Sequence, residues 1–220
     1  MPTTPGLGVE LDRGKLAELH AQYLSCGVRN RDDLAQTYAT GPRPGPLMSA
    51  FIKRALGTDI ASLEEIANDP RFQQAIIPAG NLAGTAEEAG RFFQMMLNGG
   101  KWGRRRICSE RTVARAVQEF GNRTVDRTLF IPMRFSAGLM LGDEPFGVWG
   151  PNSRQAFGHV GLINKFAWAD PQRDMSAAVL TSGIPVIAHH LPALVNVLRS
   201  ICNTIPVREG EPKPFALQLA

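Results

Sequence analysis

The hydrophobic pattern of this chain changes from a helical period to a strand-like one near residue 120. Upstream of that point, apolar residues recur every three or four positions in two stretches, each preceded by a capping residue. Thr85 and Glu88 form a capping-box pattern, and Asn98-Gly-Gly100 offers residues that tolerate a left-handed backbone at a helix end. Ser109 stands at the start of the second stretch. The spacing predicts helices over 85–97 and 109–120.

Short apolar segments that are typical of strands follow, over 133–141, 155–166, 166–169 and 175–181. Between the last two, Asp170-Pro-Gln-Arg-Asp174 predicts a hairpin turn, because Asp and Pro favour turn geometry. A stripe of aliphatic residues over 188–201 predicts a closing helix. Helices followed by antiparallel strands and one last helix indicate an α+β fold.

Before residue 85 the sequence predicts a Pro/Gly loop and three short helices, the first from an amphipathic pattern over 11–23. The loop is Thr40-Gly-Pro-Arg-Pro-Gly-Pro46, a helix is expected over 47–56, and Ser62-Leu-Glu-Glu65 has the capping-box pattern of another. We therefore divide the chain into three parts. Residues 1–45 form an N-terminal extension that contains a short helix and the Pro/Gly loop, residues 46–205 form the main domain, and residues 206–220 form a C-terminal tail.

Composition limits the class of protein. With 220 residues, 44% of them hydrophobic and 20% charged, the chain can build one sizeable core and is neither fibrous nor disordered. No apolar run reaches the roughly 18 residues of a membrane span, and the first residues lack a secretory pattern. Cys26, Cys108 and Cys202 are odd in number and far apart, which favours free thiols in a reducing compartment. We expect a cytoplasmic protein without a membrane partner.

The charge pattern gives little support to nucleic-acid binding. The net charge of +4 is spread thinly, and the only dense basic run is Lys101-Trp-Gly-Arg-Arg-Arg106. That run is either a phosphate-binding patch or a solvated turn between two helices, and we favour the turn. No glycine-rich phosphate loop is present, and His189-His190 are adjacent, so on a helix they point apart and do not chelate one ion. No cofactor and no metal are expected.

His159 is the most conspicuous candidate for chemistry. It lies in Ala156-Phe-Gly-His-Val-Gly161, an apolar strand pattern with glycine close on both sides. Glycine there lets another backbone or a ligand approach closely, and histidine changes its charge near neutral pH. The alternative is a half-buried histidine with a purely structural role.

The stretch Gly150–Gly161, with Phe166–Pro171 and Ala178–Ser182, resembles the C-terminal part of the serine β-lactamase and penicillin-binding-protein-like superfamily. The class C-like esterases are the branch it is most similar to. Ile77–Glu88 and Leu97-Asn-Gly-Gly100 resemble the block that precedes that part, so the likeness extends over about 45–202. It implies the C-terminal part of the β-lactamase/transpeptidase-like fold, an antiparallel sheet flanked by helices, without the N-terminal strands and the nucleophile helix.

The resemblance also implies a mechanism. In such enzymes the serine of a Ser-x-x-Lys motif attacks an ester or lactam, a lysine and a tyrosine move protons, and an acyl-enzyme is hydrolysed. His159-Val160-Gly161 matches the family's third motif, on the strand that edges the cleft. By that layout His159 lies near the tyrosine or the substrate carboxylate, and the backbone N–H of Leu162 is an oxyanion donor.

The chain departs from the family at the nucleophile. None of its serines has a lysine three residues later; Ser49 comes nearest, with Lys53 four residues on. Tyr23-Leu-Ser25 has the form of the tyrosine motif but precedes nothing that the family shows, and Tyr38-Ala-Thr40 does not match it. Ile163-Asn164-Lys165 replaces the small residues usual after the third motif.

Three functions follow. The first is a carboxylesterase-like serine hydrolase portion that is inactive alone, takes ester-type small molecules, and associates as a homo-oligomer or with a partner supplying the missing strands. The second is a non-catalytic binding or interaction protein that keeps part of the fold. The third, an independent enzyme using Ser153 or Ser182 with His159, has no acidic residue placed to orient the histidine.

Overall fold

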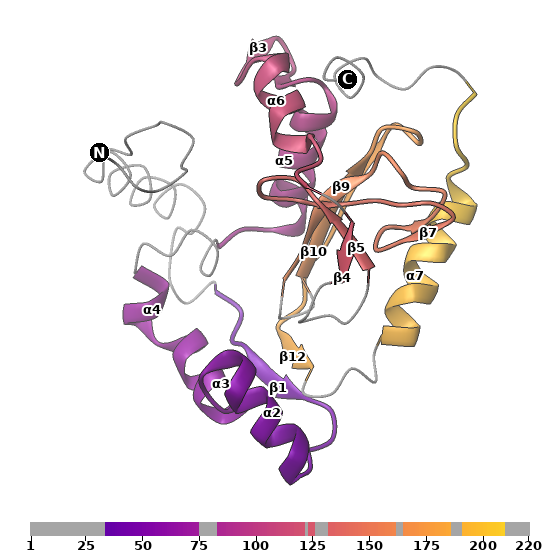
Figure 1. Cartoon of the computed structure of the whole chain (residues 1–220). Coiled ribbons are helices and arrows are strands. Elements are labelled where there is room, and N and C mark those ends of the chain that lie inside the picture. The colour runs from indigo at the N-terminus through magenta and orange to yellow at the C-terminus, as the bar shows by residue number, and fades with distance from the viewer. Residues whose placement is uncertain are drawn as a thin grey trace, which may run out of the picture.

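A six-stranded antiparallel sheet forms the middle of the molecule, and helices lie on both of its faces (Figure 1). The computed structural model describes residues 34–74, 83–121, 123–125, 132–161, 165–185 and 191–209. Across the sheet the strands follow the order β11, β10, β9, β6, β5 and β4. In chain order they are β4 (Thr124–Val125), β5 (Pro132–Phe135), β6 (Met140–Leu141), β9 (Phe157–Gly161), β10 (Lys165–Asp170) and β11 (Met175–Val179). The predicted α+β class is confirmed.

One face of the sheet is covered by α5 (Ala86–Leu97), and α6 (Glu110–Val117) packs beside it. Thr85 caps α5 as predicted: its hydroxyl accepts from the Glu88 backbone N–H, and the Glu88 carboxylate accepts from the Thr85 N–H at 2.8 Å. The Thr85 N–H and hydroxyl both donate to this carboxylate, which lowers the pKa of Glu88. Ser109 caps α6, which ends earlier than predicted, so Phe120 lies outside the helix and is exposed.

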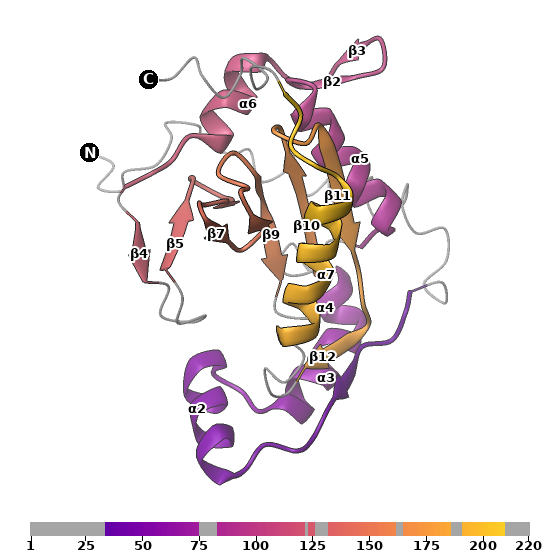
Figure 2. The ribbon, with the colours of Figure 1, turned by 90° about the vertical axis from the view of Figure 1, so that its right-hand side faces the viewer.

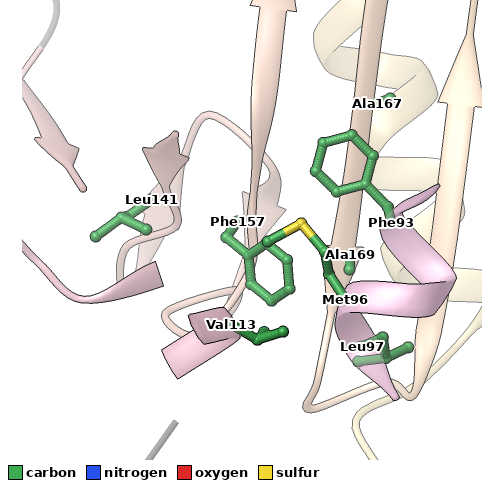
Figure 3. Close-up of a cluster of buried hydrophobic side chains, with 8 residues drawn as sticks. All are labelled: Phe93, Met96, Leu97, Val113, Leu141, Phe157, Ala167 and Ala169. Atoms are coloured by element: carbon green, nitrogen blue, oxygen red, sulfur yellow. The ribbon is translucent and has the colours of Figure 1, made fainter. Parts of the chain in front are cut away.

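The core under these helices joins side chains from both helices to the sheet (Figure 3). Helical spacing aligns the α5 residues on the sheet-facing side, while alternate strand residues point toward them. Its buried members are Phe93, Met96, Leu97, Val113, Leu141, Phe157, Ala167 and Ala169. Phe92, predicted on the same helix face, is instead exposed.

The opposite face of the sheet is covered by α7 (Leu191–Thr204), the predicted closing helix (Figure 2). Trp149 and Trp168 are buried and stacked there, with ring centroids 5.6 Å apart. The Trp149 indole N–H donates to the Met140 carbonyl, which satisfies its one polar atom. Leu198 of α7 packs against this pair, so the molecule has one apolar layer on each side of the sheet.

Residues 34–74 form a separate helical region at one end of the molecule (Figures 1 and 2). It contains β1 (Tyr38–Thr40), α2 (Pro46–Leu56), α3 (Ile60–Asn68) and α4 (Pro70–Gln74). The helix predicted over 47–56 is confirmed, but the capping box at Ser62 is wrong. Asp59 is the cap, three residues earlier, and its carboxylate accepts from the Ser62 N–H at 2.8 Å.

The region is joined to the sheet end by a parallel pairing of β1 with β12 (Gly183–Pro185), which follows β11. This pairing joins residues on either side of the predicted boundary at residue 45. An ion pair of Arg208 with Asp174, at 2.7 Å, likewise joins residues on either side of the predicted boundary at 206. The assignment of 1–45, 46–205 and 206–220 as domains stays a prediction. Residues 1–33 and 210–220 lie outside the described ranges.

The basic run folds as a hairpin between α5 and α6, made of β2 (Lys101–Trp102) and β3 (Arg105–Arg106). Its side chains are exposed, as expected for a solvated turn. The Arg106 guanidinium donates to the carbonyls of Gly99 and Cys108 and pairs with Glu110, so it closes the turn against the start of α6. A second hairpin joins β7 (Phe146–Gly147) to β8 (Gly150–Pro151).

Among the described helices, none is long and apolar enough to cross a membrane.

Candidate functional site

The third-motif residues His159, Val160 and Gly161 lie at the C-terminal end of β9. Strand β10 pairs with β9 along its whole length, with Ala167 opposite His159 and Lys165 opposite Gly161. On its other side β9 pairs with β6 only at Phe157 and Gly158. Within the described residues, the far edge of β9 therefore has no strand partner from His159 onward.

The His159 side chain is exposed rather than half-buried, and its role stays a prediction. It shares a face of β9 with Phe157, because alternate strand residues point to the same side. Phe157 is buried against α5, whereas His159 lies beyond this cover. No described group donates to its imidazole or accepts from it.

The surroundings of the two glycines near His159 constrain them to different degrees. A side chain at Gly158 would place its Cβ 2.3 Å from the Ala167 carbonyl oxygen and 2.5 Å from the Trp168 Cβ. Gly158 is thus required by the close packing of β10, which is one of the two explanations that the sequence allowed. At Gly161 the nearest atom is the Lys165 carbonyl oxygen at 3.3 Å, a much weaker constraint.

Leu162, the predicted oxyanion donor, lies outside the described residues, as do Ile163 and Asn164. Lys165 is described and exposed at the start of β10. The roles of Leu162, and of Val160 and Gly161 as motif residues, therefore stay predictions.

The serines considered as replacement nucleophiles have structural surroundings. Ser153 is fully buried, and its hydroxyl donates to the Gly150 carbonyl at 2.8 Å. A nucleophile needs access to substrate and a base to accept its proton, and Ser153 has neither in this arrangement. Ser182 is exposed beside β12, where its carbonyl accepts from the Tyr38 N–H. The hydroxyl of Ser49 on α2 faces the Pro44 carbonyl at 3.3 Å.

A buried ion pair at the β10–β11 turn was not predicted from the sequence. Arg173 is 4% exposed, and its guanidinium lies 2.7 Å from the Asp170 carboxylate. It also donates to the carbonyls of Pro151, Asn152 and Ile205, so it joins three loops. The pattern predicted the turn, but nothing local indicated that its charges are buried. The cluster is fully hydrogen-bonded and closed to solvent, which makes it a structural feature.

No three potential metal ligands gather among the residues that the structure describes. His189 and His190 lie outside those residues, as does Cys26. Cys108 and Cys202 are free thiols, as predicted. Burial raises the pKa of Cys202, so its thiol stays protonated and unreactive.

Comparison with known proteins gives the family. The beta-lactamase family model matches residues 15–194. The esterase/beta-lactamase LipL of Mycobacterium tuberculosis is 31% identical over 119 residues, which are 54% of this chain and 26% of LipL.

Two solved structures are also similar. A family VIII carboxylesterase superposes with a TM-score of 0.52 and 25% identity, over 63% of this chain and 37% of that one. A penicillin-binding-protein homologue from Caulobacter crescentus has a TM-score of 0.55 at 20% identity, over 78% and 43%. The matched region is less than half of each relative. The family match and the similar folds show that this chain belongs to the beta-lactamase family, within the serine β-lactamase and penicillin-binding-protein-like superfamily.

Proposed function

We propose that this chain forms the cleft-edge part of a carboxylesterase-like serine hydrolase and does not turn over substrate alone. The observation that carries the proposal is the end of β9: His159 is exposed, and the strand has an edge free of described strand partners from this residue onward. An ester-type small molecule binds there with its carbonyl oxygen near the Leu162 N–H. His159 hydrogen-bonds the polar end of the molecule.

The lack of turnover follows from the residues that could attack. The sequence contains no Ser-x-x-Lys, and Ser153 is enclosed with its hydroxyl donated to a backbone carbonyl. Ser49 has Lys53 at the wrong spacing, although both are on one helix. Without an activated nucleophile, binding of the ester does not lead to an acyl-enzyme.

Association is the second part of the proposal. In the described residues β11 pairs only with β10, so its outer edge is open to another strand. That strand comes from a second copy of this chain or from a polypeptide that supplies the strands and the nucleophile of a complete hydrolase.

The test separates binding from chemistry. Purified chain is incubated with a short-chain nitrophenyl ester and, separately, with a fluorophosphonate probe; we expect no turnover and no labelled serine. The corresponding nitrophenyl alkyl ether, which cannot be hydrolysed, is titrated against isotope-labelled protein. We expect amide shifts at residues 159–161 that are lost in His159→Ala and kept in Arg154→Ala, an exposed control in the turn before β9.

Each alternative outcome has a distinct meaning. Turnover with one labelled serine overturns the claim of inactivity and identifies a rebuilt nucleophile. Absence of both turnover and ether binding overturns the ester site and favours the second candidate, a non-catalytic interaction protein. The fully buried Ser153 and the missing Ser-x-x-Lys are the observations that favour this second candidate.

A further inference from the structure

Within the part of the chain that the structure describes, the outer edge of β11 has no strand partner and lacks three features by which proteins protect a sheet edge. Met175–Val179 has no charge, no proline and no bulge, since all five residues pair one-to-one with β10. Edges of this kind are templates for another strand. Helix α5 lies near β11 (Figure 2). Between them is a groove of about 460 Å³, lined by Ala86, Glu87, Gly90, Arg91, Gln94, Trp102 and residues 176–178.

Strand β11 is suited to pairing with β11 of a second copy of the chain. Ser176 and Ala178 point toward α5, where the Ser176 hydroxyl donates to the Gln94 side-chain oxygen at 3.1 Å and Ala178 packs on the core. Met175, Ala177 and Val179 point to the α7 face. An antiparallel pairing about a twofold axis at Ala177 sets 176 opposite 178 of the other copy and 175 opposite 179. Both faces then continue from one sheet into the next.

The helix above the edge has room for a second copy of itself. Ala86 and Gly90 are one turn apart on the groove side, and no atom lies within 4 Å of a Cβ built on Gly90. Two α5 helices over adjoining β11 strands must approach to the usual interhelical distance of about 8–10 Å. Small side chains at these two positions allow this approach.

The charges on the same helix face are self-complementary. Glu87 and Arg91 form an exposed ion pair within α5, with side-chain exposures of 71% and 55%. Such an exposed pair contributes little by itself, so its exchange costs little. In a twofold interface a residue i that meets j also receives j from the partner copy. Antiparallel α5 helices thus bring Glu87 of one copy near Arg91 of the other, twice.

We propose that two copies of this chain associate through β11 into a twofold dimer with one continuous twelve-stranded sheet, in which α5 lies beside α5 and Glu87 and Arg91 exchange partners. This inference rests on the association proposed above and is independent of ester binding at β9. It commits the open edge to a second copy rather than to a different polypeptide.

Sedimentation velocity over a range of concentrations tests the dimer. We expect a species of twice 23.9 kDa that dissociates on dilution. Arg91→Glu places four acidic side chains at the interface and weakens the dimer at least about tenfold, because facing like charges repel. The double variant Glu87→Arg/Arg91→Glu restores opposite pairs, and its affinity returns to within about threefold of wild type. Arg111→Glu, the same charge change on an exposed part of α6, leaves the dimer intact.

Hydrogen exchange then locates the interface. We expect amides of residues 176–178 to exchange more slowly as the concentration of wild-type chain rises, and this protection to disappear in Arg91→Glu. A chain that is monomeric at every concentration overturns the proposal. A dimer that is indifferent to Arg91→Glu, or weakened further by the double variant, overturns the β11 geometry while leaving association in place. Binding of the ether is measured by the amide shifts at residues 159–161, so the outcome of that experiment does not depend on whether the chain dimerises.

Discussion

The helical region of residues 34–74 and the sheet region of residues 83–209 differ in what they bury. The buried apolar side chains that the structure describes all belong to the sheet region, and most of them lie on the two faces of the sheet. In the helical region α3 buries none of its residues, and the apolar Leu47 and Phe51 of α2 are exposed, Leu47 to 90%. Helices thus form in both regions, but among the residues that the structure describes, apolar layers are buried between packed elements in the sheet region alone.

The helical region is held mainly by polar contacts. Asn68 and Thr37 exchange two hydrogen bonds of 2.8 Å, and the Glu64 carboxylate accepts from the Ala39 N–H at 2.9 Å. The pairing of β1 with β12 adds a three-residue ladder. Since local stability follows buried apolar contact, we expect this region to open more readily than the sheet.

The largest effect is expected for Arg173→Ala in the sheet region. It leaves the Asp170 carboxylate buried without its cation and frees three backbone carbonyls, which should lower the free energy of unfolding by about 3–5 kcal/mol. Urea denaturation followed by tryptophan fluorescence measures this, because Trp149 and Trp168 are in the core.

Arg71→Ala is the matched control for this prediction. Arg71 lies 2.7 Å from Asp69, the same distance as between Arg173 and Asp170, but it is 92% exposed. The pair lowers the pKa of Asp69 to about 2, yet solvent screens the interaction and the variant should unfold at the wild-type urea concentration. Equal losses in the two variants would contradict the idea that burial decides the strength of these pairs.

A smaller and local effect is expected for Asn68→Ala. It removes both hydrogen bonds to Thr37, whose backbone N–H is then left without its acceptor in a nearly buried position, at a cost of about 1–2 kcal/mol. Hydrogen exchange should become faster in α3 and stay unchanged in β10. Faster exchange throughout the sheet would show that the two regions unfold together.

The sequence predicted those elements whose signals are local. The cap formed by Thr85 with Glu88, the helices α5 and α7 and the turn at 170–174 each have a local pattern, and each is present in the structure. The exposed Phe92 and Val195 are exceptions within the two helical repeats. At the start of α3 the sequence offers two capping residues, Asp59 and Ser62. Asp59 caps the helix, although Ser62 and Glu65 match the capping-box pattern.

The elements that the sequence did not predict depend on distant partners. β1 and β12 are three residues each and are separated by about 140 positions, so neither has a pattern of its own. The burial of Arg173 arises from loops before β9 and after α7 that meet at the turn. For the site, the strand pattern around His159 predicted β9. The exposure of His159 depends on where β6 stops pairing with β9, and no local sequence pattern predicts that point.

Removing one helix cap from each region sharpens the comparison further. Thr85→Ala deletes the acceptor for the Glu88 N–H at the start of α5 and should destabilise the whole protein by about 1 kcal/mol, because α5 covers the core. Asp59→Ala deletes the same kind of cap on α3. It should leave the global unfolding transition in place and increase exchange only within α3. A global shift of the same size from Asp59→Ala would remove the distinction between the regions.

The smallest effect is expected for Glu119→Gln. Arg134 donates to both Glu119 carboxylate oxygens, at 2.9 and 2.7 Å, and these hydrogen bonds hold the pKa of Glu119 below its usual value. Since the side chain is partly exposed, the variant should lose only about 0.5 kcal/mol at pH 7.

The pH dependence of this variant provides the stronger test. A carboxylate with a lowered pKa in the folded state stabilises the protein above its unfolded pKa of about 4.3, and the contribution is lost as the pH falls through the folded value. The difference in unfolding free energy between wild type and Glu119→Gln should therefore be constant near neutral pH and shrink below about pH 4. A difference that persists at pH 2 would assign the effect to packing of the side chain, because charge no longer distinguishes the two proteins there.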